Sequence, residues 1–104
     1  MNITQITPNV GAEIHNIDAS RVSESERARL RDALIEHKVL VLRDQDISSA
    51  DYVDFVSTFG EVVADDLIPQ DGHPAELGAI HVRATERQTI NFWHMDYSYR
   101  EQPT

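Results

Sequence analysis

The chain has 104 residues, of which 40% are hydrophobic and 26% charged, a balance typical of one globular folding unit and not of a disordered or fibrous chain. Its formal net charge of −9 repels phosphate backbones and anionic lipid surfaces, so nucleic acid and membrane are poor candidates as partners. The absence of cysteine excludes disulfides, thiolate metal sites and a cysteine nucleophile, and it is compatible with a cytoplasmic location.

Two strands and a helix are predicted in the amino-terminal third. Residues 3–6 and 12–17 alternate apolar and polar side chains, and Pro8 and Gly11 between them favour a turn. Ser23 is followed three residues later by Glu26, which is a capping-box pattern. The apolar spacing beyond this pair predicts a helix over residues 24–37.

A buried strand and a second helix are predicted next. Residues 38–43 form a continuous aliphatic run, typical of a central strand that is covered on both faces. Ser48 can cap a helix over residues 49–59, and Gly60 can end it in the left-handed conformation. The helix carries one apolar stripe that we expect to pack on the sheet, formed by Tyr52, Phe55, Val56 and Phe59.

The remaining residues are predicted to form a long loop and the start of another sheet. Residues 62–78 hold prolines, glycines and acids without a sustained period, which indicates a surface loop. Residues 79–83 are a further strand candidate. The strand that begins before His94 has no partner strands in the sequence after it, so we expect the chain to be an amino-terminal piece of a larger domain.

His94 and Asp96 are the candidate metal ligands, two residues apart in strand-like sequence. Alternate side chains of a strand share a face, so the imidazole and the carboxylate would project together. They can supply two corners of the two-His-one-carboxylate triad that holds non-haem Fe(II) and leaves positions open for substrate and oxygen. A strand histidine is more often a hydrogen-bonded structural residue, so this triplet alone leaves both roles open.

Several sequence segments, which occur in a fixed order along the chain, favour the metal-ligand role over the structural one. They are residues 6–14, 34–45 and 55–61, followed by Trp93-His94-Met95-Asp96. Together they resemble the Fe(II)- and 2-oxoglutarate-dependent dioxygenases of the taurine and phenoxyacetate dioxygenase type, the TauD/TfdA family, over almost the whole chain. The last segment matches the family's Trp-His-x-Asp iron motif, and Trp93 and its neighbours would support the strand that presents it.

The resemblance implies an α+β fold in which residues 1–104 are the amino-terminal portion of one dioxygenase domain, a double-stranded β-helix (jelly-roll, clavaminate synthase-like) with flanking helices. It implies that His94 and Asp96 bind Fe(II), and that the whole protein uses 2-oxoglutarate and O2 to hydroxylate a small anionic substrate with release of succinate and CO2. Asn91 is a candidate substrate contact. The family's distal histidine and its 2-oxoglutarate-binding arginine lie downstream of this motif, so we expect the chain alone to be inactive.

Two rival interpretations remain open. A cupin-like isomerase or hydrolase could use the same motif with another divalent metal, and a non-catalytic interaction module could retain it for structure. The sequence is also compatible with a homo-oligomer. Among the other histidines, His15 and His37 are expected at the surface or at a helix end. For His73 and His81 we expect solvent exposure or ordinary hydrogen bonding, with a place at the mouth of the site as the alternative, and neither is a predicted ligand.

Overall fold

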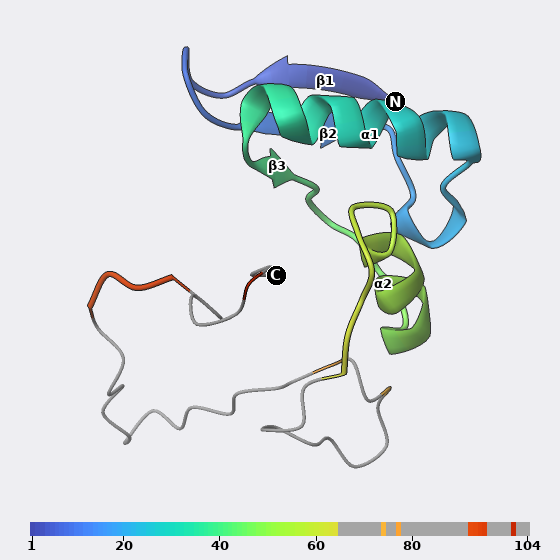
Figure 1. Cartoon of the computed structure of the whole chain (residues 1–104). Helices are drawn as coiled ribbons and strands as arrows, with labels where there is room; N and C mark the ends of the chain where they lie inside the picture. Colours follow the sequence, from blue (N-terminus) through green and yellow to red (C-terminus); the bar gives the residue numbers. More distant parts are fainter. Residues whose placement is uncertain (65–73, 75–76, 78–91, 96–100, 102–104) are drawn as a thin grey trace, which may run out of the picture.

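The computed structural model describes residues 1–64, 74, 77, 92–95 and 101 (Figure 1). A three-stranded sheet has the order β1-β2-β3, where β1 is Asn2–Gln5, β2 is Ala12–His15 and β3 is Leu40–Val41. The 3₁₀ turn η1 (Ala19–Arg21) and helix α1 (Glu24–His37) connect β2 to β3, and helix α2 (Ser49–Val56) follows. This mixed sheet with two helices agrees with the predicted α+β class.

Two of the predicted elements, the long loop and the strand that follows it, lie mostly or wholly outside the described residues. Most of the predicted loop and all of the strand over residues 79–83 lie outside the described residues. The double-stranded β-helix therefore stays a prediction at this point. None of the helices in the described part is long and apolar enough to span a membrane.

The predicted hairpin is confirmed. β1 and β2 run antiparallel, with Ile3 opposite Ile14. The turn closes where the Ile6 N–H donates to the Gly11 carbonyl at 2.9 Å, and Gly11 has a φ of 93°, which glycine adopts without a steric penalty. β2 ends two residues earlier than predicted, because Asn16 turns out of the strand with a φ of 53°.

The first helix has the predicted bounds. Ser23 Oγ accepts a hydrogen bond from the Glu26 N–H at 3.4 Å, and the Glu26 carboxylate accepts one from the Ser23 N–H at 3.0 Å, which completes the capping box. The Ser23 hydroxyl also donates to the Glu26 carboxylate at 2.7 Å, and this bond, followed by that from the Ser23 N–H, holds the pKa of the Glu26 carboxyl below its ordinary value. The helix ends at Lys38, whose φ of 67° and N–H bond to the Leu34 carbonyl form a left-handed cap.

The predicted central strand is wrong in length and position. β3 covers only Leu40 and Val41, both half-buried, and it lies at the edge of the described sheet, in which β2 is central. The left-handed Lys38 delays the start of the strand, and Asp44, with a φ of 55°, turns the chain shortly after its end. Local backbone turns therefore restrict pairing to a shorter stretch than the aliphatic run suggested.

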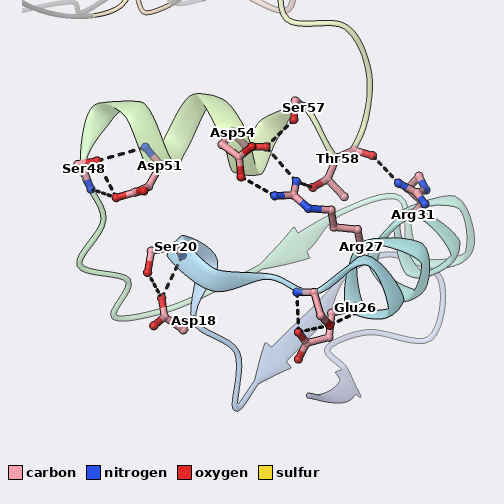
Figure 2. Close-up of polar contacts among 11 residues, drawn as sticks. Asp18, Ser20, Glu26, Arg27, Arg31, Ser48, Asp51, Asp54, Ser57 and Thr58 are labelled. Carbon is pink, nitrogen blue, oxygen red and sulfur yellow. Dashed lines mark hydrogen bonds and ion pairs between the residues drawn. The ribbon is translucent and has the colours of Figure 1, made fainter.

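The second helix begins as predicted and ends earlier. Ser48 and Asp51 form a second capping box, drawn in Figure 2. The helix stops at Val56 and not at residue 59, because the N–H groups of Thr58 and Phe59 bond to carbonyls three residues back, at 3.0 Å each, in a tighter turn. Gly60 is not in the left-handed conformation, so its predicted role as the helix end is wrong.

One residue from each of four elements forms the core. Ile14, Ala19, Leu30 and Phe55 pack together, and the Leu30 side chain is 0% exposed. α1 covers one face of the sheet, whereas α2 lies beside η1 (Figure 1). Three residues of the predicted stripe reach this core, but Tyr52 is 48% exposed. The stripe thus joins a core shared with the sheet through Phe55, Val56 and Phe59, and Tyr52 faces solvent.

Truncation of Leu30 should cost much more stability than truncation of Ile35 on the same helix. Leu30→Ala leaves a cavity at a fully buried position and should lower the free energy of unfolding by about 2–5 kcal/mol. Ile35 is 70% exposed, so Ile35→Ala should change it by less than about 0.5 kcal/mol. Urea unfolding of both variants measures the difference; equal losses would contradict the described core.

The stabilisation from the Glu26 charge should depend on pH. Because the pKa of this carboxyl is lowered in the folded state, the ionised form adds stability above its unfolded pKa, and this contribution is lost as pH falls through the folded pKa, below the ordinary 4.5. Wild type should exceed Glu26→Gln in unfolding free energy at about pH 7, and the gap should narrow towards about pH 3. A gap that is constant between these conditions would argue against the capping contact.

Candidate metal site

The predicted ligand His94 lies on a short described segment, residues 92–95. Its side chain is exposed and so are its neighbours: Phe92 is 65% exposed, Trp93 103% and Met95 68%. Residues 92–95 are not in a strand, and the continuation of the expected strand from residue 96 lies outside the described residues. The supporting role of Trp93 stays a prediction, because the strand it would support continues outside the described residues.

The His94 imidazole is in contact with the residue two positions before it. Nδ1 lies 3.1 Å from the Phe92 carbonyl oxygen. The two rings meet edge to face, with centroids 5.7 Å apart and planes at 62°. Since a carbonyl oxygen can only accept, the contact is a hydrogen bond when Nδ1 carries the proton. In the neutral ring the lone pair is then on Nε2.

This arrangement has the chemistry of a metal-binding histidine. Such a residue binds as the neutral imidazole and commonly donates its other N–H to a carbonyl or carboxylate, which sets the tautomer. The residue present therefore fits a divalent cation as one donor. Within the described ranges no three His, Cys, Asp or Glu side chains form a group that could hold a metal ion. Asp96 and Asn91 lie outside these ranges, so the structure does not test their predicted roles.

Two of the remaining histidines lie in the described residues and two lie outside them. His15 ends β2 with an exposed side chain and His37 ends α1 with a half-buried one, which confirms the surface and helix-end placement. The His37 carbonyl accepts a bond from the Gly11 N–H at 2.8 Å and so links the helix end to the hairpin. His73 and His81 lie outside the described residues.

A hollow lies beside the second helix, and none of the described residues 92–95 lines it. It has a volume of about 710 Å³ and runs along α2 and the segment after it. Its lining is apolar at Val53 and Val62 and acidic at Asp54 and Glu61. The Asp54 carboxylate is already paired with Arg27, so the hollow has no unbalanced charge at that residue.

Arg27 joins the two helices, and the sequence analysis missed it. Figure 2 shows its guanidinium at the end of α2, where Nη1 donates to the Asp54 carbonyl at 3.0 Å and to Thr58 Oγ1 at 2.6 Å, and Nη2 pairs with the Asp54 carboxylate. The Arg27 side chain is 16% exposed and Thr58 is 4% exposed. The planar fork of arginine suits this multiple contact. The partners are far apart in sequence, so no local pattern marks them.

Gln45 makes a second connection that the sequence analysis did not assign. Its Oε1 accepts from the Ala19 N–H at 2.9 Å, and its Nε2 donates to the Arg43 carbonyl at 2.8 Å. Arg43 itself pairs with the Glu13 carboxylate on β2, with its Nε 2.9 Å from Oε1. These bonds tie η1 and the sheet to the segment that leads into α2.

The chain belongs to the taurine catabolism dioxygenase TauD, TfdA family, whose model matches residues 2–104. An alpha-ketoglutarate-dependent sulfonate dioxygenase of Saccharomyces cerevisiae is 26% identical over 116 aligned positions, covering 99% of this chain and 28% of the relative. The chain thus spans 28% of the length of that curated relative.

Two solved structures from Burkholderia xenovorans share the fold. A proposed alpha-ketoglutarate-dependent taurine dioxygenase superposes with a TM-score of 0.81 at 25% identity, covering 98% of this chain and 38% of its own. A taurine dioxygenase superposes with a TM-score of 0.62 at 32% identity, and the match covers 70% of this chain and 27% of the dioxygenase. The described sheet and helices are therefore a dioxygenase-type arrangement.

Removal of the Arg27 side chain should destabilise the fold. Arg27→Ala leaves buried Thr58 without the donor that the structure gives it, and hydrogen bonds to charged groups are worth about 1.5–3 kcal/mol each, so we expect a loss of at least about 1.5 kcal/mol. Arg21, 85% exposed and 3.9 Å from Asp18, is the control, and Arg21→Ala should cost less than about 1 kcal/mol. Thermal or urea unfolding distinguishes the two; similar effects would remove Arg27 from its linking role.

Proposed function

We propose that the whole protein is an Fe(II)- and 2-oxoglutarate-dependent dioxygenase that hydroxylates a small, anionic organic substrate. The observation that carries this proposal is the family match over residues 2–104, which includes Trp93-His94-Met95-Asp96. The substrate class is supported by the sulfonate and taurine named for two relatives, since both are small sulfonates. The net charge of −9 and the lack of cysteine support a small-molecule substrate and a cytoplasmic location.

His94 and Asp96 are the residues that would hold the metal in this proposal. Fe(II), with 2-oxoglutarate and O2, would supply the oxidation of a substrate C–H bond with release of succinate and CO2. The neutral His94 imidazole contributes a nitrogen donor, and the Asp96 carboxylate contributes a negative charge that offsets part of the charge of the cation. Asn91, beside the motif, offers amide N–H groups that can donate to an anionic oxygen of the substrate.

The proposal includes the finer fold. Residues 1–104 would be the amino-terminal portion of one dioxygenase domain, with the double-stranded β-helix as its main sheet. The superposition at a TM-score of 0.81 over 98% of the chain supports this assignment. The core around Leu30 would then anchor the flanking layer of helices, and the bonds of Arg27 and Gln45 would hold α2 and η1 in that layer.

Succinate release by the whole protein tests this function. With Fe(II), ascorbate, O2 and 2-oxoglutarate, we expect one of a panel of sulfonates, sulfate esters and aryloxy acids to stimulate turnover. His94→Ala and Asp96→Ala should each reduce it by more than about 100-fold, because even supporting residues of metal ligands cost 10–100-fold.

His15→Ala is the matched control, an exposed histidine at the end of β2 whose loss should leave turnover unchanged. Turnover that survives Asp96→Ala would overturn the ligand assignment. Absence of Fe(II) binding by the whole protein would overturn the function.

A further inference from the structure

The first strand is an edge strand that carries no charge. In the described part of the chain β1 pairs on one side only, because the sheet order is β1-β2-β3, and Figure 1 shows it at the outer rim of the molecule. Residues 1–12 have no charged side chain, although the chain has a net charge of −9 and 26% charged residues. We propose that two copies of the whole protein pair through β1 and form a symmetric dimer with a continuous sheet.

The backbone of β1 offers free hydrogen-bonding groups to such a partner. Gln5 lies opposite Ala12, whose N–H donates to the Val39 carbonyl and so points away from β1. The pair of Gln5 and Ala12 is therefore not hydrogen-bonded, and since bonded and non-bonded pairs alternate, neither is the pair at Ile3. Ile3 and Gln5 direct their N–H and C=O groups to the open edge, where no other described residue bonds to them.

This edge also lacks the protection that open strand edges usually have, which is a charged side chain, a proline or a bulge. The register of β1 with β2 is regular, and Pro8 lies beyond the strand. The opposite edge of the described sheet differs, because β3 covers only two residues and lies between the charged, exposed side chains of Lys38 and Arg43. A strongly negative chain repels a second copy of itself, and an uncharged edge offers that copy a place to approach.

A two-fold axis at Thr4 gives the pairing its register. Ile3 then lies opposite the partner's Gln5, and the two equivalent pairs exchange N–H···O bonds. Thr4 lies opposite the partner's Thr4, and such threonine pairs across strands are favourable. Arg29 donates to the Met1 carbonyl at 3.3 Å, so the pairing stops at the start of β1. The interface is short, and we expect a dimer that dissociates on dilution.

Sedimentation velocity of the whole protein over a concentration series measures this dimer. Thr4→Lys places two like charges opposite one another, so we expect the dissociation constant to rise by at least about 10-fold. Within one copy the new side chain lies opposite Glu13, which favours it. Ala28→Lys, which adds the same charge on the exposed side of α1, should leave the dimer unchanged. A wild-type protein that stays monomeric, or a dimer that Thr4→Lys does not weaken, would overturn the proposal.

A mixture of two variants separates loss of pairing from loss of folding. Thr4→Glu alone should also be monomeric, for the same reason as Thr4→Lys. Equal parts of the two variants place opposite charges across the axis and should restore the dimer. If both variants have the circular dichroism of the wild type and their mixture stays monomeric, the proposed pairing is wrong.

Amide hydrogen exchange at Ile3 and Gln5 distinguishes a second copy from another part of the same chain as the group that covers this edge. We expect slow exchange at concentrations at which the dimer forms, and fast exchange after dilution and in Thr4→Lys. Slow exchange that persists in the monomer would mean that the rest of the same chain covers the edge, and the dimer proposal would be abandoned.

Discussion

The meeting of four elements at the Leu30 side chain is the constraint on which the described fold depends. Leu30 comes from α1 and is fully buried against Ile14, Ala19 and Phe55, which belong to the sheet, the 3₁₀ turn and the second helix. Each element is too short to be stable alone, so burial of apolar surface at this point holds them together. The polar links of Arg27 and Gln45 surround this contact and fix the angles between the elements.

The local features of this fold were predictable, because their causes act within one helical turn. Ser23 with Glu26, and Ser48 with Asp51, mark both helix starts correctly. The end of the second helix, which was predicted wrongly, depends on a distant contact. The second helix stops before Gly60 where Thr58 turns inward to Arg27, a residue 31 positions earlier, and no periodicity within the helix can indicate that contact.

At the candidate site, too, features set by residue type could be predicted and features set by conformation could not. His94 could be found because a metal donor is a property of its residue type within a motif, and the family match over residues 2–104 supports that reading. The contact of its Nδ1 with the Phe92 carbonyl could not be predicted. Every residue has a backbone carbonyl, and only the conformation of residues 92–94 brings this one to Nδ1. The ligand role of Asp96 and the substrate role of Asn91 remain predictions, because they depend on residues outside the described ranges.

The parallel pairing of β2 with β3 determines the order in which this unit can assemble. β1 and β2 meet across a short turn, but Ala12 reaches Leu40 only after the chain has passed through η1 and α1. Pairs this distant in sequence require the closure of a long loop and form slowly. During synthesis the hairpin and α1 can form as they emerge, whereas the sheet cannot close until β3 has left the ribosome. Until then the strand edge of β2 is open to pairing with other nascent chains.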